Sequence, residues 1–245
     1  MGDTTLLRTL AGSHAFGTFL TDGSGDVDEL VVSVLNRKYY LGLPECCEAA
    51  SQQKFVQGVS GAPSDRLDVT THEVTRFFQL LMKGNPSVFF ALYSKMPNMA
   101  SPWANKVWGD LVVANRHLFF SHNVYAAYCG MASQHGRMLL SAEKGAAVRW
   151  KAAMHAVRLM RNLVEWLRDR EMVVNRTGVD ARYLLEVRQG LHSVGEVHAT
   201  LNALFEEAEA LVKKADLPAR VDTNAVSELL VDTKVFFWMD SKGEQ

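Results

Sequence analysis

The segment GSHAFGTFLTDGSGDVDELVV, residues 12–32, places two aspartates where a glycine-rich loop gives way to a run of apolar residues. Because side chains alternate between the two faces of a strand, Asp26 and Asp28 would point to one face and Val27 to the other. Two carboxylates that crowd one spot repel each other unless a cation lies between them or one keeps its proton. The segment therefore predicts either a strand that begins with a cation site or a surface turn in which Asp bonds to nearby backbone groups.

Strands and a helix are predicted on both sides of this segment. Residues 6–12, LLRTLAG, are typical of a buried strand that ends in a turn, and residues 29–35, ELVVSVL, continue the strand that carries the aspartates. LDVTT, residues 67–71, alternates like a third strand, and the following HEVTRFFQLLMKG has helical spacing. Gly84 and the nearby Pro86 predict the end of that helix.

The chain changes character near residues 97–102. Before this point, residues 41–66 are polar and favour a loop; after it, long apolar-periodic segments with hardly any strand signal predict helices. We therefore expect an α+β fold in two parts, with the strands in residues 1–100 and a largely α-helical half in residues 101–245.

The composition excludes several classes of protein. The 26 basic and 27 acidic residues give a formal net charge of −1, so the chain has no general attraction to nucleic acid or to an anionic membrane. Its start lacks the pattern of a signal peptide, and no apolar run reaches the roughly 18 residues that span a bilayer. Cys46, Cys47 and Cys129 give neither a disulfide framework nor the spacing of zinc ligands. We expect a cytoplasmic protein that does not enter a membrane.

Charge is unevenly distributed along the second half of the chain. Residues 149–188 contain nine Lys or Arg against five acidic residues, whereas residues 191–245 contain ten acidic residues against five basic ones. One edge of the helical half is therefore expected to be positive. Such an edge would suit either a nucleic-acid backbone or a triphosphate, and no RNA-binding motif accompanies it.

The three predicted strands and their loops bring a phosphate-binding turn and several carboxylates into one neighbourhood. Backbone N–H groups of a Gly12-Ser13 turn can hold a phosphate, and the serine adds a hydroxyl. Asp26 and Asp28 can bind a divalent ion that bridges triphosphate oxygens, and Asp68 from the neighbouring strand can share a second ion about 3.5 to 4 Å away. Asp68 is also placed to take the proton of an attacking hydroxyl.

These residues resemble a known family. A Gly-Ser turn, twelve intervening residues and Asp-Val-Asp leading into an apolar strand are similar to the signature of the DNA polymerase beta-like nucleotidyltransferase superfamily. The order of the later segments resembles one family within it, the RNA repair pathway DNA polymerase beta-like nucleotidyltransferases. This likeness spans about residues 6–232 and rests on DVTTHEVTRFFQLLMKGNPSVFFALY, HLFFSHNVYAAYCGMASQHGRML, KAAMHAVRLMRNLVEWLRDREMVVNR and LPARVD.

The resemblance implies a mixed-sheet nucleotidyltransferase core followed by helices that close over the nucleotide site. It also implies dependence on Mg²⁺ or Mn²⁺, and transfer of a nucleoside monophosphate from a nucleoside triphosphate (NTP) to a hydroxyl, with an RNA end as a candidate acceptor. Asp26 and Asp28 match the metal-binding aspartates, and Gly12 and Ser13 match the phosphate-contacting turn. Asp68 is the candidate third carboxylate.

Some positions leave alternatives open. Asp65 and Glu73 compete with Asp68 for the role of third carboxylate, and His14 stands where many relatives carry arginine. The acceptor can be an RNA end, a protein or a small molecule. A nucleotide- or RNA-binding module without catalytic activity is the alternative from a different class, although it would have little reason to keep both aspartates of the D-x-D motif.

A second group of candidate residues lies in the predicted helix of residues 148–171. Lys151, His155 and Arg158 are spaced i, i+4 and i+7, which places them on one face of that helix. One interpretation is that this basic face contacts the triphosphate or the pyrophosphate leaving group, as the family pattern implies. The other is an ordinary solvated face that pairs in part with Glu165 and Asp169.

Overall fold

The computed structural model describes residues 4–20, 26–42, 54–59, 66–94, 102–140 and 149–240. Four strands form one sheet in the order β1-β2-β4-β3: β1 (Thr4–Leu10), β2 (Val27–Val34), β3 (Lys54–Val59) and β4 (Arg66–Glu73). The pairs β1–β2 and β3–β4 are antiparallel, whereas β2–β4 is parallel, so the sheet is mixed. The three predicted strands are confirmed. The prediction of a loop throughout residues 41–66 is wrong for β3, which pairs with β4 although its local sequence carries little strand signal.

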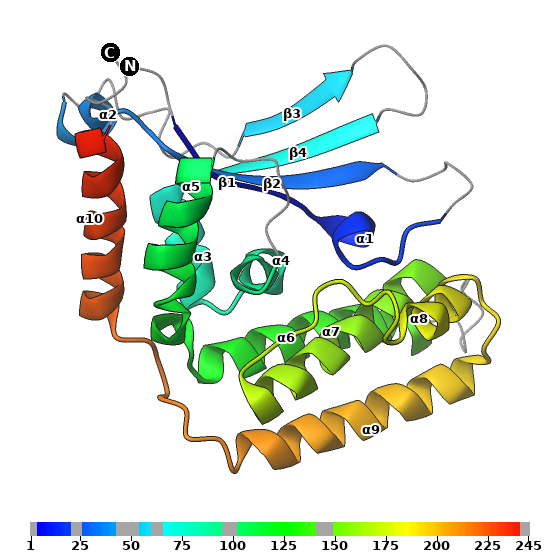
Figure 1. Ribbon diagram of the computed structural model, residues 1–245. Coiled ribbons are helices and arrows are strands. Elements are labelled where there is room, and N and C mark those ends of the chain that lie inside the picture. The colour runs from blue at the N-terminus through cyan, green and yellow to red at the C-terminus, as the bar shows by residue number, and fades with distance from the viewer. Residues whose placement is uncertain are drawn as a thin grey trace.

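Helices make up most of the rest of the described chain (Figure 1). The N-terminal half contains α1 (Gly12–Ala15), α2 (Arg37–Leu41), α3 (Val74–Met82), α4 (Pro86–Phe89) and the 3₁₀ turn η3 (Phe90–Leu92). The C-terminal half contains α5 (Pro102–Val107), the π-helical turn η4 (Trp108–Val113), the 3₁₀ turn η5 (Arg116–Phe119), α6 (His122–Leu140), α7 (Trp150–Asp169), α8 (Ala181–Arg188), α9 (Val194–Val212) and α10 (Thr223–Asp240). The expected α+β fold with a largely helical second half is confirmed.

The alternation of β2 decides which way the aspartates face. Leu30, Val32 and Val34 are buried, whereas Val31 and Ser33, which alternate with them, are more exposed. Asp28 precedes Leu30 by two positions, so it lies on the face that packs on the helices. The sheet therefore presents the start of β2 to the helical side of the molecule.

The helix after β4 begins and ends at residues that the sequence marks. Glu73 accepts hydrogen bonds from the backbone N–H groups of Thr75 and Arg76, which caps the start of α3. The end of the helix at Gly84 is confirmed: this glycine has φ +64°, and a side chain there would meet the backbone of Val124.

One hydrophobic core runs through both halves of the chain. Its buried side chains come from β1, β2, α3 and α4 on one side and from α6, α7 and α9 on the other. The indole N–H of Trp166 donates to the hydroxyl of Tyr93 at 2.9 Å, which joins α7 to the end of η3. The C-terminal helix also returns to the N-terminal half, because Lys234 donates to the Thr75 hydroxyl at 2.7 Å. The boundary between residues 1–100 and 101–245 stays a prediction.

Among the described residues, no helix has both the length and the apolar content that crossing a membrane would require.

Candidate functional site

The predicted carboxylates meet at the start of the two parallel strands. In the register of β2 and β4, Asp28 lies directly opposite Asp68, so their side chains leave the same face of the sheet. Asp26 comes just before β2. Burial raises the pKa of Asp28, and the negative charges of Asp68 and Asp26 raise it further, while Lys151 and His14 act in the opposite direction. The structure therefore brings these three carboxylates, one lysine and one histidine into each other's electrostatic field.

The carboxylates do not form a finished metal cage. Within the described ranges, no three His, Cys, Asp or Glu side chains are arranged to hold a single ion together. The donors nevertheless fit Mg²⁺ chemically, because this ion prefers oxygen ligands and uses one or two carboxylates together with water and phosphate oxygens.

The glycine of the Gly-Ser turn lies against the Asp28 carboxylate. Gly12 has φ +54°, and a Cβ atom at this position would lie 1.8 Å from Oδ2 of Asp28. The backbone N–H of Ala11 donates to the carbonyl oxygen of Asp28 at 2.7 Å. Only glycine fits this approach and this backbone conformation. The turn that was predicted to contact phosphate is therefore directly beside one predicted metal ligand.

The competitors of Asp68 lie elsewhere. Glu73 is buried and engaged: it caps α3, accepts from the Tyr40 hydroxyl and lies 4.0 Å from the ammonium of Lys234. In the strand register Glu73 is opposite Ser33 and not Asp28. Asp65 lies outside the described residues. Of the three candidates, Asp68 is the one that the described structure places next to Asp28.

The predicted basic face of α7 is exposed at Lys151 and partly buried at His155 and Arg158. Lys151 is exposed and close enough to Asp28 to lower its pKa. Burial, followed by the charge of Arg158, lowers the pKa of His155 to about 3, so this imidazole is neutral at neutral pH. Burial lowers the pKa of Arg158 to about 10, which leaves its guanidinium charged. Near the carboxylates, α7 therefore offers two cations and one neutral hydrogen-bonding group.

The Arg158 guanidinium stacks on an aromatic ring and forms no ion pair with a carboxylate among the described residues. Its guanidinium carbon lies 3.6 Å from the centre of the Phe16 ring, and its Nε has no hydrogen-bond partner among the described residues. The expected pairing of this face with Glu165 is not observed, because Glu165 binds Arg176. The Arg158 guanidinium can therefore still donate hydrogen bonds.

The helical half also holds the residues after the Gly-Ser turn. The backbone N–H of Arg176 donates to the carbonyl oxygen of Phe16 at 3.1 Å, and the Arg188 guanidinium donates to that of Thr18 at 2.6 Å. Between them, Gly17 has φ +65° and packs against Thr177 and Asn175. Sequence reasoning missed these contacts, because they join residues about 160 to 170 positions apart and no local pattern indicates them.

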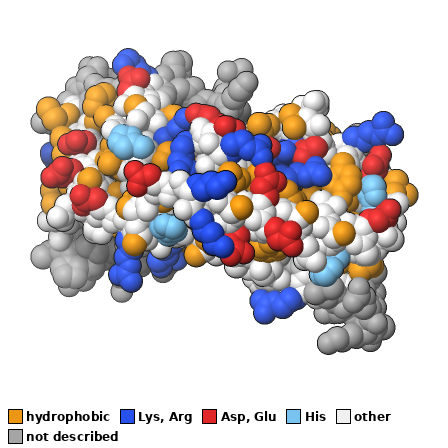
Figure 2. Space-filling model, turned by 90° about the horizontal axis from the view of Figure 1, so that it is seen from below, with side chains coloured by type: hydrophobic (Ala, Val, Ile, Leu, Met, Phe, Trp, Pro, Cys, Tyr) orange, Lys and Arg blue, Asp and Glu red, His pale blue; other side chains and the backbone are white. Residues whose placement is uncertain are grey.

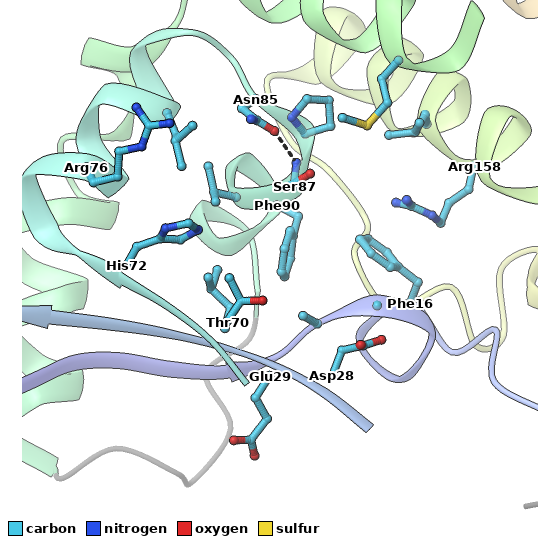
Figure 3. A pocket seen from close by; sticks show the side chains of 18 residues that line it. Phe16, Asp28, Glu29, Thr70, His72, Arg76, Asn85, Ser87, Phe90 and Arg158 are labelled. Carbon is cyan, nitrogen blue, oxygen red and sulfur yellow. Dashed lines mark hydrogen bonds between the residues drawn. The ribbon is translucent and has the colours of Figure 1, made fainter. Parts of the chain in front are cut away.

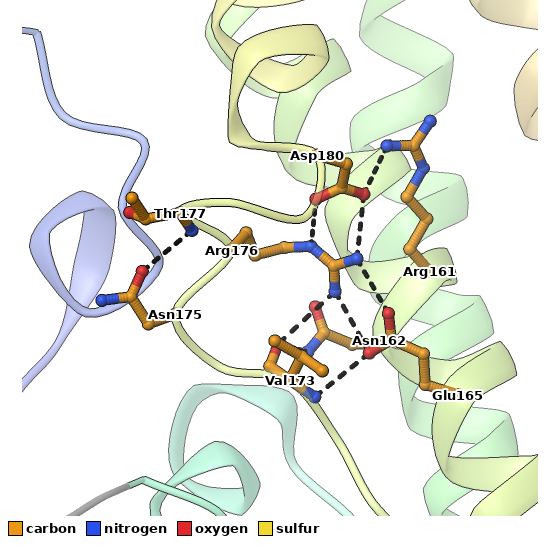
Figure 4. A network of polar contacts seen from close by, with 8 residues as sticks. All are labelled: Arg161, Asn162, Glu165, Val173, Asn175, Arg176, Thr177 and Asp180. Atoms are coloured by element: carbon orange, nitrogen blue, oxygen red, sulfur yellow. Dashed lines mark hydrogen bonds and ion pairs between the residues drawn. The ribbon is translucent and has the colours of Figure 1, made fainter.

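A network of buried charges orders this contacting loop (Figure 4). The Arg176 side chain is 2% exposed and forms ion pairs with Glu165 and Asp180, while Arg161 also binds Asp180. Two further arginines of residues 149–188 also form ion pairs: Arg168 binds Glu207, and Arg182 binds Glu186. The surface seen in Figure 2 accordingly mixes basic and acidic side chains. Four of the nine basic residues of the predicted positive edge, Arg161, Arg168, Arg176 and Arg182, are therefore paired with carboxylates within the protein.

A cavity of about 540 Å³ lies beside Asp28, between the sheet and the helices (Figure 3). At one end it is lined by Gly12, Asp28 and Arg158, and at the other by Thr70, His72, Arg76, Asn85 and Ser87. A cavity of this size is typical of sites for small molecules. Of the three candidate carboxylates, Asp28 lines this space, which can take a ligand the size of a nucleotide.

Comparison with known proteins identifies the family of this chain. The family model described as the RNA repair pathway DNA polymerase beta family matches residues 2–232. Searches of curated proteins and of solved structures found no match. The matched range contains the Gly-Ser turn, the three carboxylates and helix α7. With nearly all of its length matched, the chain belongs to the RNA repair pathway DNA polymerase beta family.

Proposed function

We propose that this protein is a nucleotidyltransferase that depends on a divalent metal ion and moves a nucleoside monophosphate from an NTP to a hydroxyl acceptor. The observation that carries the proposal is Asp28, which lines a cavity of nucleotide size beside Gly12 and has Asp68 opposite it and Asp26 close enough to raise its pKa. The family match supports the same class of reaction.

Each residue has a role that its surroundings suit. Asp26, Asp28 and Asp68 would hold Mg²⁺ or Mn²⁺, which when bound neutralises triphosphate oxygens and lowers the pKa of a nearby hydroxyl. Gly12 and Ser13 would bind phosphate through backbone N–H groups and a hydroxyl. Lys151 and Arg158 would add positive charge, and His155 would take part as a neutral hydrogen-bonding group because its pKa is about 3.

The proposed reaction is an in-line displacement at the α-phosphorus. The acceptor oxygen forms a bond to the α-phosphorus, the bond from that phosphorus to the bridging oxygen of the β-phosphate breaks, and pyrophosphate leaves. Asp68 is exposed and would take the proton of the acceptor hydroxyl. The family description favours an RNA end as the acceptor.

The test is transfer of label from each of the four α-labelled NTPs, with Mg²⁺ or Mn²⁺, to a pool of small RNAs. The double variant Asp26→Asn, Asp28→Asn runs beside the unchanged protein. Asp216→Asn with Asp232→Asn is a matched control, since both of these aspartates are exposed and lie outside the site. We expect labelled RNA and pyrophosphate from the protein and from the control, and neither product from the site variant.

Other outcomes separate the alternatives. Release of pyrophosphate without labelled RNA would support the proposed transferase activity and indicate that the acceptor is a protein or a small molecule. Metal-dependent nucleotide binding without any pyrophosphate would favour a binding module without catalytic activity. Equal activity in the site variant and the protein would exclude Asp26 and Asp28 from the reaction.

A further inference from the structure

The end of the cavity away from Asp28 carries polar side chains for which the proposed metal and phosphate chemistry has no use. Thr70 and His72 lie on β4, Arg76 on α3, and Asn85 and Ser87 at the start of α4. Figure 3 shows His72 and Arg76 on the opposite side of the cavity from Asp28 and Arg158. We call these five residues the distal wall.

His72 is the most unusual member of the distal wall. Its side chain is 6% exposed and lines the cavity, yet Nδ1 has no hydrogen-bond partner among the described residues. Burial, and then the charge of Arg76, lower the pKa of His72, so the ring is neutral near pH 7. Most buried polar atoms in native proteins are paired, and an unpaired one beside a cavity indicates a partner that comes from a ligand.

The remaining polar groups of the wall are mainly donors. Asn85 Oδ1 already accepts the backbone N–H of Ser87 at 2.9 Å, which leaves the amide N–H groups of Asn85 to donate. The guanidinium of Arg76 is exposed and takes part in no ion pair within the described ranges, and it can only donate. Between the two ends, the cavity is lined by apolar side chains: Leu80, Pro86, Phe90, Met131 and Leu159. A flat, partly apolar ligand with acceptor atoms on one edge would match this arrangement.

The distance from the carboxylates also suits a nucleoside. His72 is four residues beyond Asp68 on the same strand and the same face, which is about 13 Å along β4 at the usual rise per residue. A nucleoside whose phosphate or hydroxyl lies at the carboxylates would extend its base toward the distal wall.

We propose that the distal wall is a nucleobase subsite that selects a base with a carbonyl oxygen, namely guanine, cytosine or uracil, over adenine. Adenine has no carbonyl oxygen, so it cannot accept from Arg76 and Asn85 in the same way. The inference rests on the proposed nucleotidyl transfer, since that reaction is what brings a nucleoside to the cavity. The base can come from the donor NTP or from the terminal nucleotide of the acceptor, and both present the same chemistry.

The experiment measures equilibrium binding to the full chain with Mg²⁺ present. One arm uses the α,β-methylene analogues of ATP, CTP, GTP and UTP, which bind without reacting. The other arm uses short RNAs that differ only in their 3′-terminal base. We expect at least one carbonyl-bearing base to bind about tenfold more tightly than adenine, in the first arm if the base belongs to the donor and in the second if it belongs to the acceptor.

Two variants and one control test the residues. Arg76→Gln should shrink the preference several-fold. Asn85→Asp keeps the cap on α4, because Asp accepts from Ser87 as Asn does, but it replaces a donor by an acceptor and should change the base preference, since the hydrogen bond to a carbonyl oxygen is lost. The control Arg182→Gln removes an arginine that is 93% exposed on α8 and should change nothing.

The outcomes that contradict the proposal are of two kinds: those that overturn the nucleobase subsite alone, and one that also overturns the proposed function. Binding that requires Mg²⁺ and Asp28 but is equal for all bases in both arms would overturn the subsite and leave the proposed function standing. A preference for adenine, or a preference that Arg76→Gln and Asn85→Asp leave unchanged, would overturn the subsite as well. Absence of nucleotide binding that depends on Mg²⁺ or Asp28 would overturn both.

Discussion

Two groups of charged side chains adjoin the turn of residues 12–18, and they are compensated in opposite ways. At the start of β2 and β4, Asp28 faces Asp68, with Asp26 close by, and their charges raise the pKa of Asp28. In the helical half, Asp180 binds Arg176 and Arg161. Burial alone would raise the pKa of Asp180, but the hydrogen bonds and charges of these arginines outweigh it and lower the pKa.

The difference separates a charge cluster that is paired within the protein from the carboxylates of the proposed metal site. Buried charges that serve only the fold are paired within the protein, since an unpaired buried charge is costly. Carboxylates that stay close to each other and only partly compensated retain a repulsion that a bound cation would relieve. The ion pairs of Arg176 order the loop that contacts the turn of residues 12–18. The repulsion among Asp26, Asp28 and Asp68 is what a bound cation would relieve.

The largest expected effect comes from breaking the paired cluster. Arg176→Met leaves Glu165 and Asp180 without their buried partner, and removal of one member of a buried ion pair typically costs about 3–5 kcal/mol. Urea unfolding followed by circular dichroism measures the loss. The exposed Arg182→Met is the control and should stay within about 0.5 kcal/mol of the unchanged protein. Equal stability of the two variants would show that the Arg176 network does not support the fold.

The second effect comes from the carboxylates at the start of β2 and β4, and it concerns catalytic activity. Asp28→Asn should lower nucleotidyl transfer by about 10²- to 10³-fold, the usual size for loss of one electrostatic contributor at an active site. The melting temperature should not fall, because the substitution removes a repulsion. Asp180→Asn should instead lower the melting temperature, because it removes the ion pairs with Arg176 and Arg161. A loss of stability in Asp28→Asn as large as that in Asp180→Asn would break the distinction between the two groups.

A smaller effect tests the contact between the turn and the helical half. Gly17→Ala would put a Cβ atom 2.4 Å from Oγ1 of Thr177 at a φ of +65°, so both contact and backbone strain oppose it. Gly178→Ala has φ +81° but nothing within 4 Å, so it isolates the strain of about 1–2 kcal/mol. We expect Gly17→Ala to lose about 1 kcal/mol more than Gly178→Ala and to bind NTP more weakly. Thermal unfolding measures the loss of stability, and nucleotide titration measures the loss of NTP affinity. Equal losses in Gly17→Ala and Gly178→Ala would show that the contact of Gly17 with Thr177 contributes nothing.

The smallest effect is a pair of opposite pH dependences. The pKa of Asp28 is raised above its ordinary 3.8, so Asp28 stabilises the fold below that pH and this contribution is lost as the pH rises through the folded-state pKa. The pKa of Asp180 is lowered, so its contribution is present above pH 3.8 and is lost as the pH falls.

Urea unfolding between about pH 3 and pH 8 measures both contributions, with slopes of at most about 1.4 kcal/mol per pH unit for each group. The stability of Asp28→Asn relative to the unchanged protein should rise with pH, and that of Asp180→Asn should fall. Slopes of the same sign would contradict the assignment.

Local patterns were enough to predict much of the fold and the position of the carboxylates. Alternation identifies β2, and the helical spacing after residue 72 together with Gly84 identifies α3 and its end. The D-x-D spacing predicts that Asp26 and Asp28 lie near one another; Asp26 comes just before β2 and is close enough to raise the pKa of Asp28. The ordered motifs also point to the family that matches residues 2–232. Each of these features depends on neighbours within a few residues, which is why the amino-acid sequence alone determines them.

The tertiary structure decided what depends on distant partners. The strand β3 forms because β4 offers it an edge, and Glu73 is separated from the carboxylates because it caps α3 and binds Tyr40. His155 has the spacing of a basic residue but becomes neutral, since burial beside Arg158 disfavours its charged form.

The contacts of Arg176 and Arg188 with the turn, and the unpaired Nδ1 of His72 at the cavity, likewise arise only when segments far apart in the chain pack together. Charge state and contact are properties of the folded surroundings, and those surroundings are made by residues that no local pattern connects.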